Sequence, residues 1–342
     1  SQDRIQLYPI SEAIVSQPEM LKSNLSDLSN DNLSPFVALN SAFMESGIVL
    51  RVLPNVVLKK PIEIIDLTIK TETPIMRHPR NILVIDEGAE ATLIKTHLGC
   101  SAKDCFTNAV TDISVGRSGK LRLYTVQNNS QGSVHLSTTN TNIASQASFE
   151  TFSFTSGGHI SRSEMNVNLN GVGADCNVSG TFLMRGQEHC DTTTLIEHVA
   201  PETNSREIFK GILDDESRGV FQGKILVHKD AQRINGHQLS KTLLLSNGAE
   251  MDAKPELEIY ADDVKCSHGA TTGQLDETSM FYMRSRGIPE PLARELLMQS
   301  FIGDVLNEIS NDNVREGILG LVLERLSSNN LAPHTEQKNE GK

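Results

Sequence analysis

The chain has 342 residues, of which 38% are hydrophobic, and its formal net charge at pH 7 is -12. This length is sufficient for a large buried core, while the acidic balance excludes proteins that bind nucleic acid through basic surfaces. No apolar run approaches the roughly 20 residues of a membrane-spanning helix and the first residues lack the pattern of an export signal, so we expect a cytoplasmic protein that binds neither nucleic acid nor membrane.

Residues 1–50 are predicted to form a mostly helical segment. Ser34 is a suitable N-cap, and Pro35 favours the first position of a helix. Apolar residues between Phe36 and Phe43 then recur on one helical face.

Residues 51–275 have the pattern of β-strands. Short apolar and β-branched runs such as IEIIDLTI, RNILVID and KLRLYTV alternate with Gly, Asn, Asp and Ser. Almost no helical period occurs in this stretch, so we expect it to be entirely β.

Small-residue corners recur within this stretch at Gly88, Gly119, Ala147 and Gly173, in steps of about 25 to 30 residues, and Gly248 follows after nearly three further steps. A fixed period of this size is typical of a solenoid, in which each coil buries its inner face on its neighbours. With strands of about five residues, one coil holds two or three strands. The pattern favours a β-helix over a β-sandwich with chance spacing.

Residues 276–327 are predicted to be helical, and residues 328–342 are too polar to fold by themselves. Asp276 is a candidate cap for the first helix, and Pro291 opens a longer one. An apolar stripe on that longer helix includes Leu292, Leu296, Leu297, Phe301 and Val305. The stripe is explained either by internal packing or by a surface that covers the coil stack and docks another protein.

The segment ADDVKCSHGATTGQLDE places Cys266 and His268 two residues apart where the β region ends. In an extended chain these two side chains point to the same side, so both can approach one ion. Iron-sulfur clusters usually take about four protein ligands and zinc three or four, so the pair is at most half of a site. Either a second chain or a transient donor supplies the rest, or the pair is a buried thiol beside a hydrogen-bonded imidazole.

The remaining cysteines give weaker signals. The five cysteines of the chain are odd in number and irregularly spaced, which favours reduced thiols over disulfides. Cys100 and Cys105 lack a second paired motif, and we expect them to be ordinary thiols. His189 and Cys190 are adjacent in a β-rich stretch, where neighbouring side chains point to opposite faces, so we do not expect this pair to bind one ion.

Three long segments resemble the SufD branch of the SufB/SufD family, which belongs to the SUF iron-sulfur cluster assembly system. These segments are PETNSREIFKGILDDESRGVFQGKILVHKDAQ, KTLLLSNGAEMDAKPELEIYADDVKCSHGATTGQLDE and FYMRSRGIPEPLARELLMQSFIGDVLNEI. The resemblance is strong over roughly residues 195–310 and more diffuse upstream. It implies a mainly β fold, a right-handed parallel β-helix with helical regions at its N- and C-terminal ends.

The resemblance also implies partners and a site. Members of the family pair with SufB through their β-helices, and their C-terminal helices dock the SufC ATPase. Carried over by position, Cys266 and His268 lie at the SufB–SufD interface, where a transient iron-sulfur cluster or iron is held and the isolated chain binds no cofactor tightly. The exposed strand edge can also pair two copies of the isolated chain.

We therefore expect a non-catalytic scaffold subunit. Gly119-Lys120 resembles the end of a phosphate-binding loop, but Leu121 replaces the Ser or Thr that holds magnesium, so ATP hydrolysis must come from a partner. One alternative is a carbohydrate-active β-helix enzyme, which the absence of Trp and the 4% aromatic content disfavour. A second alternative is a structural adaptor without metal contact, which differs from the scaffold only at His268.

Overall fold

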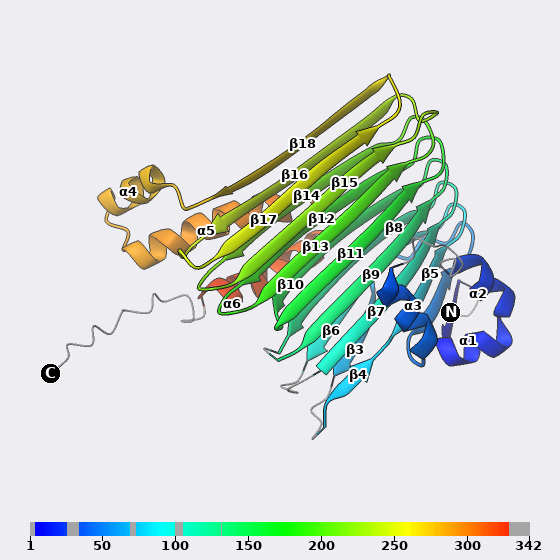
Figure 1. Ribbon diagram of the computed structural model, residues 1–342. Coiled ribbons are helices and arrows are strands. Elements are labelled where there is room, and N and C mark those ends of the chain that lie inside the picture. Colours follow the sequence, from blue (N-terminus) through cyan, green and yellow to red (C-terminus); the bar gives the residue numbers. More distant parts are fainter. Residues whose placement is uncertain (1–3, 26–33, 69–72, 100–104, 131, 328–342) are drawn as a thin grey trace. The chain divides into compact units, whose positions relative to one another are not determined.

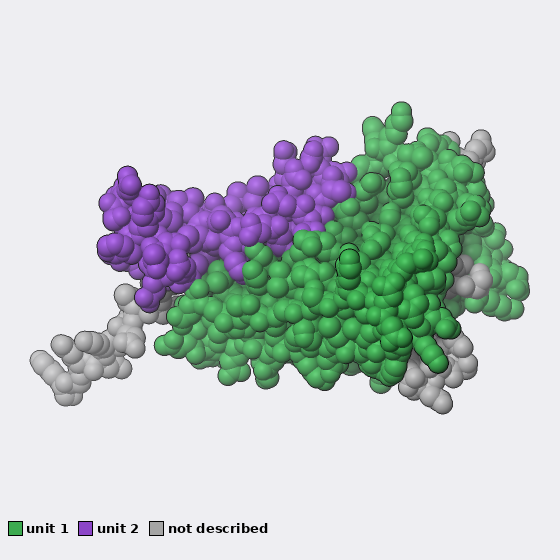
Figure 2. Space-filling model, turned by 90° about the horizontal axis from the view of Figure 1, so that it is seen from above, with its two compact units in different colours: residues 1–274 green, residues 275–342 purple. Residues whose placement is uncertain are grey.

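The computed structural model describes residues 4–25, 34–68, 73–99, 105–130 and 132–327. The chain divides into two compact units, residues 1–274 and residues 275–342, which Figure 2 colours separately. Cys100 and the predicted unfolded tail 328–342 lie outside the described residues.

The first unit contains two large sheets (Figure 1). The ten-stranded sheet has the order β1 (Ile5–Pro9), β2 (Ile48–Val52), β5 (Arg80–Ile85), β7 (Cys105–Val115), β9 (Val134–Ile143), β11 (Ile160–Leu169), β13 (His189–His198), β15 (Arg218–Val227) and β17 (Glu250–Ile259), with β4 (Ile75–Arg77) beside β7. The eight-stranded sheet has the order β18 (Val264–Gly273), β16 (Ile234–Leu244), β14 (Asn204–Leu213), β12 (Asp175–Met184), β10 (Ser148–Gly157), β8 (Lys120–Asn129), β6 (Glu90–Gly99) and β3 (Ile62–Thr68).

From β5 onward the chain alternates between the two sheets, so that each coil contributes one strand to each of them. All paired strands are parallel except β1 and β2, which are antiparallel. This arrangement is a parallel β-solenoid, with two strands in each coil. The predicted β-helix is therefore confirmed.

The core lies between the sheets, because every second side chain of a strand points inward. Phe149 is in register with Leu121 on one side and with Cys176 on the other, and all three are buried in the main core cluster. Across the core, Ile143 is in register with Leu169 in the other sheet. Stacked apolar columns of this kind bury each coil against the next.

The strands are longer than the predicted five residues. Most of them, including β8, β9 and β10, contain 10 residues. Asn and Ser were taken to separate the apolar runs, although residues of both types continue β9 in the run STTNTN. Asn166 of β11 donates to Asn140 Oδ1 of β9 at 2.9 Å, so stacked amides satisfy one another along the sheet.

One corner of the solenoid repeats a single turn geometry. The residues with positive φ at this corner are Gly88, Ser118, Gln146, Gly173, Glu202 and Arg233. A hydrogen-bond ladder joins these turns, since Gly88 N donates to Arg117 O at 2.9 Å and Ser118 N donates to Ser145 O at 3.0 Å. The predicted step from Gly173 to Gly248 was wrong, because Gly248 lies between β16 and β17, at the opposite corner.

The N-terminal segment contains α1 (Ile10–Ser16), α2 (Pro18–Asn24) and α3 (Pro35–Phe43). The prediction missed β1, which pairs with β2 and packs Ile5 against the main core, so tertiary pairing overrides local pattern there. Helix α3 begins at Pro35, but the Ser34 side chain makes no capping hydrogen bond. The buried Asn40 amide instead anchors α3 by donating to Pro79 O at 3.0 Å and to Asn108 O at 2.8 Å.

The second unit contains α4 (Glu277–Ser285), α5 (Glu290–Leu306) and α6 (Asp312–Ser327). Asp276 caps α4 as predicted, accepting hydrogen bonds from Thr278 N at 3.3 Å and Ser279 N at 2.9 Å. None of the described helices is long and apolar enough to cross a membrane.

Candidate functional site

Cys266 and His268 lie on β18, the outermost strand of the eight-stranded sheet. β18 pairs with β16 on one side, with Cys266 opposite Gly236 and His268 opposite Gln238. Among the described residues no strand pairs with the other edge of β18. The unpaired groups of such an edge are a template for a strand from another chain.

The two side chains share the inward face of β18. Both residues continue inward-facing columns, because the Gly236 and Gln238 positions of β16 are buried. Ser267 between them faces the other way, and its Oγ lies 2.8 Å from His237 Nδ1 on the outer face. The alternation expected from the sequence therefore places the thiol and the imidazole side by side.

The two side chains differ in exposure. His268 is exposed, whereas Cys266 is half-buried and packs against a small cluster that includes Ile225 and Ile234. Burial raises the pKa of the Cys266 thiol, and a backbone hydrogen bond from Gly236 only partly offsets this effect. A metal ion that binds the sulfur must therefore displace a proton.

The described residues contain no group of three or more His, Cys, Asp or Glu side chains arranged to hold a metal ion. A metal or cluster at Cys266 and His268 would thus need ligands from outside the described part of the chain. Of the other thiols, burial raises the pKa of Cys190 to about 12, so this side chain is an inert core group.

The sequence reasoning missed a buried cluster of polar side chains, Lys95, His97 and His135, near the other end of the solenoid. Lys95 on β6 crosses the interior and donates to Thr111 Oγ1 on β7 at 2.9 Å. The rings of His97 and His135 meet edge to face at a centroid distance of 4.6 Å. The available signal was the period of two, since Lys95 and His97 continue the inward positions of Ala91 and Leu93.

Burial shifts the pKa values of Lys95, His97 and His135. Desolvation lowers the pKa of Lys95 to about 8, although Asp66 opposes the effect. Desolvation likewise lowers the pKa of His97, and it lowers that of His135 well below its usual value. Both imidazoles are therefore neutral near pH 7.

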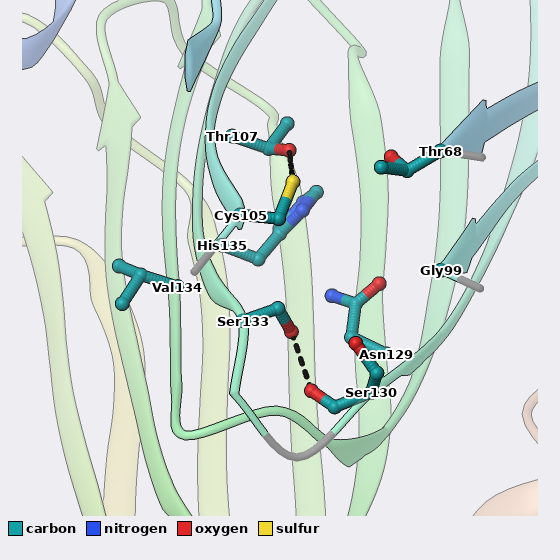
Figure 3. A pocket seen from close by; sticks show the side chains of 9 residues that line it. All are labelled: Thr68, Gly99, Cys105, Thr107, Asn129, Ser130, Ser133, Val134 and His135. Carbon is teal, nitrogen blue, oxygen red and sulfur yellow. Dashed lines mark hydrogen bonds between the residues drawn. The ribbon is translucent and has the colours of Figure 1, made fainter. Parts of the chain in front are cut away.

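A small pocket opens beside His135 (Figure 3). Its lining residues are Thr68, Gly99, Cys105, Thr107, Asn129, Ser130, Ser133, Val134 and His135. The Cys105 Sγ lies 3.8 Å from Thr107 Oγ1, and His135 Nε2 has no hydrogen-bond partner within the described residues. Most of its lining side chains are polar, but the Lys95 ammonium acts electrostatically on His135 and so disfavours a cation there.

The apolar stripe of α5 is divided between burial and exposure. Leu292 is 46% exposed and Leu296 is 38% exposed, whereas Leu297 and Phe301 are half-buried. Val305 is only 1% exposed, so it is a packing residue in this structure and is not available to a partner. The residues that α5 buries are Ala293, Met298, Ile302, Val305 and Leu306, which only partly overlap the predicted stripe.

Residues 68–301 match the family model described as "SUF system FeS cluster assembly, SufBD core domain". An iron-sulfur cluster assembly SufBD family protein of Synechocystis is 32% identical over 302 residues, which cover 86% of this chain and 66% of the relative. The iron-sulfur cluster assembly protein SufD of Escherichia coli is 34% identical over 249 residues, covering 73% and 59%. SufD of Bacillus subtilis is 25% identical over 287 residues, covering 83% and 65%. The chain therefore spans less than two thirds of the length of each of these relatives.

Proposed function

We infer a scaffold role from one premise: this chain belongs to the SufBD core family of the SUF iron-sulfur cluster assembly system. Within that family its relatives include proteins named SufD. We propose that the chain is a non-ATPase subunit without catalytic turnover of its own. In this role it pairs with a SufB-type paralogue through the β-solenoid and docks a SufC-type ATPase through its C-terminal helices.

The observation that carries the proposal is the edge strand β18. An exposed imidazole and a half-buried thiol lie side by side on a strand whose outer edge has no partner among the described residues. A strand of the paralogue that pairs with this edge would bring its own side chains next to Cys266 and His268. A site divided between two chains explains why the described residues place no third candidate ligand beside Cys266 and His268.

The chemistry of the two residues fits nascent iron or an iron-sulfur cluster, the product of the assembly reaction. A neutral imidazole offers one ring nitrogen to iron, and a thiol becomes a strong iron ligand once it loses its proton. His268 is exposed, so its ring is accessible to a metal ion. Cys266 needs deprotonation against its raised pKa, so His268 is the primary ligand and Cys266 the auxiliary one.

Replacing His268 by Ala should lower the iron and acid-labile sulfide that co-purify with the three-subunit complex under anaerobic conditions by about 10-fold or more. His237→Ala is the matched control, because His237 belongs to the neighbouring strand β16 and faces outward. We expect the control complex to retain the wild-type content. A normal cluster content in His268→Ala would instead support the metal-free adaptor.

Exposed apolar side chains on the C-terminal helices support the docking of an ATPase subunit. Phe281 is 75% exposed on α4, and Leu292 and Leu296 are exposed on α5. Apolar side chains of this size are commonly anchors in protein interfaces. Their grouping on consecutive helices favours a surface that another protein covers.

The double variant Leu292→Asp, Leu296→Asp should weaken ATPase-subunit binding by more than about 10-fold, because each change places a charge in an apolar contact. Leu319→Asp on α6 is the control, since Leu319 is 36% exposed in the same unit. Binding is measured by titration of the purified chain with the ATPase subunit. Equal affinity of the double variant and the wild type would remove this surface from the proposal.

A further inference from the structure

A buried polar column lies directly behind His268 on the inward face of the eight-stranded sheet. His268 is in register with Gln238 of β16, and Gln238 is in register with Glu207 of β14. Gln238 Nε2 donates to Glu207 Oε2 at 2.7 Å, and Thr194 Oγ1 of the opposite sheet donates to Glu207 Oε1 at 2.6 Å. Gln238 and Glu207 are fully buried, so the column leads from an exposed imidazole into the interior.

Only one of the two polar atoms of the Gln238 amide forms a hydrogen bond within the described residues. Its Nε2 is taken by Glu207, but its buried Oε1 has no hydrogen-bond partner within the described residues. A buried carbonyl oxygen without a partner is costly, so an unused acceptor in this position calls for an explanation. The next residue outward along the column is His268, on a strand whose backbone lies about 4.8 Å from that of β16.

The opposite sheet leaves space for this amide. Gly223 of β15 faces Gln238, and a Cβ at that position would lie 2.0 Å from Gln238 Nε2. Glycine within a strand often marks the close approach of another group. The hydrogen bond to Glu207 therefore holds the Gln238 amide in a space that exists because residue 223 has no side chain.

We propose that Gln238 is a positioning residue for His268, whose ring N–H donates to Gln238 Oε1 so that the other ring nitrogen is presented to iron. In a neutral imidazole one nitrogen is a donor and the other an acceptor, so a hydrogen bond to one selects the tautomer. Histidines that bind metals almost always donate the second ring N–H to an oxygen acceptor. Glu207 orients the amide from behind. This inference rests on the proposed role of His268 as a ligand.

The test reads the His268 tautomer in the isolated chain, so that it does not depend on a bound cluster. The chain is labelled with 15N-histidine, and long-range proton–nitrogen spectra are recorded at pH 8, with His268→Gln used for assignment. One tautomer should predominate in the wild type, and Gln238→Met should give a mixture of both tautomers. Methionine keeps the length of the glutamine side chain but offers no comparable acceptor.

Three further variants separate positioning from general damage. The double variant Glu207→Gln, Gln238→Glu exchanges the two groups, so that the amide at 207 donates to the carboxylate at 238, which keeps an acceptor oxygen for His268 and should restore the single tautomer. Gly223→Ala displaces the amide without removing it and should reproduce the Gln238→Met spectrum, which also covers the case that Gln238→Met does not fold. Gln127→Met is the control, because Gln127 is another buried interior amide, whose Nε2 donates to Ser161 Oγ at 2.7 Å in distant coils.

An unchanged His268 tautomer in Gln238→Met and Gly223→Ala would overturn the inference, and so would an equal change in Gln127→Met. In the purified complex, Gln238→Met should also lower bound iron by about 10-fold. The two proposals fail separately. A normal cluster content in His268→Ala would contradict the role of His268 as a ligand. An unaltered His268 tautomer in Gln238→Met and Gly223→Ala would contradict only the positioning role of Gln238.

Discussion

Replacing Lys95 by Met should raise the free energy of unfolding by about 2 kcal/mol at pH 7. Burial lowers the pKa of this lysine from 10.5 to about 8, so keeping its charge in the interior costs about 3 kcal/mol at neutral pH. Methionine has a similar length and needs no solvation. The lost hydrogen bond from Lys95 Nζ to Thr111 offsets about 1 kcal/mol of the gain.

The advantage of Lys95→Met should decrease as the pH rises. For a base whose folded pKa is lowered, the penalty is fully present below pH 8 and disappears as pH rises from about 8 to 10.5. Urea unfolding at pH 7 and at pH 10 measures the difference, with Lys120→Met as the control because Lys120 is half-exposed on β8. If Lys95→Met destabilises the protein equally at both pH values, the buried charge is not a cost, and this account of Lys95 is wrong.

Replacing Glu207 by Gln should stabilise the protein by about 3 kcal/mol at pH 8 and by little near pH 4.5. Burial raises the pKa of this carboxyl from 4.5 to about 7, and the hydrogen bonds from Thr194 and Gln238 reduce the shift only in part. A glutamine can still accept from Gln238 and can donate to the Thr194 hydroxyl. The fold around residue 207 should therefore remain intact.

The direction in which Glu207 makes stability depend on pH follows from proton binding. Between pH 4.5 and about 7 the folded protein holds a proton that the unfolded chain has released, so wild-type stability falls as the pH rises through this window. The Glu207→Gln variant has no carboxyl at this position, so its stability does not fall for this reason. Denaturant unfolding of both proteins at pH 5 and pH 8 isolates the contribution of Glu207, since other groups titrate equally in both. If the stability difference between wild type and Glu207→Gln does not change with pH, the claim that ionisation of the buried Glu207 carboxyl lowers stability is wrong.

The fold could be predicted to a large extent from local chemistry. Corners such as Gly88 and Gly173 require positive φ and recur once per coil, so the solenoid was visible in the sequence. Strand lengths were not visible, because Asn140 and Asn166 satisfy each other only after the coils stack. The error at Gly248 has a similar origin, since both corners of a coil use small residues and the sequence does not mark which corner is which.

The candidate site could be predicted only in part. The spacing of Cys266 and His268 indicated a shared face, and the structure places both on the inward side of an edge strand. The column behind them was invisible, because Gln238 and Glu207 are about 30 residues apart in sequence and meet only through strand register. The docking role of the α5 stripe stays a prediction, and helical periodicity alone did not separate exposed Leu292 from buried Val305.

The central claim is that His268 of this chain binds the assembling cluster at a seam between two subunits. Pulsed electron paramagnetic resonance of the reduced complex tests it, with 15N-histidine in this subunit alone and natural-abundance nitrogen in its partners. The account predicts a 15N coupling to the cluster that disappears in His268→Gln and persists in His237→Gln. A paramagnetic cluster without any 15N coupling in the wild-type complex would contradict it.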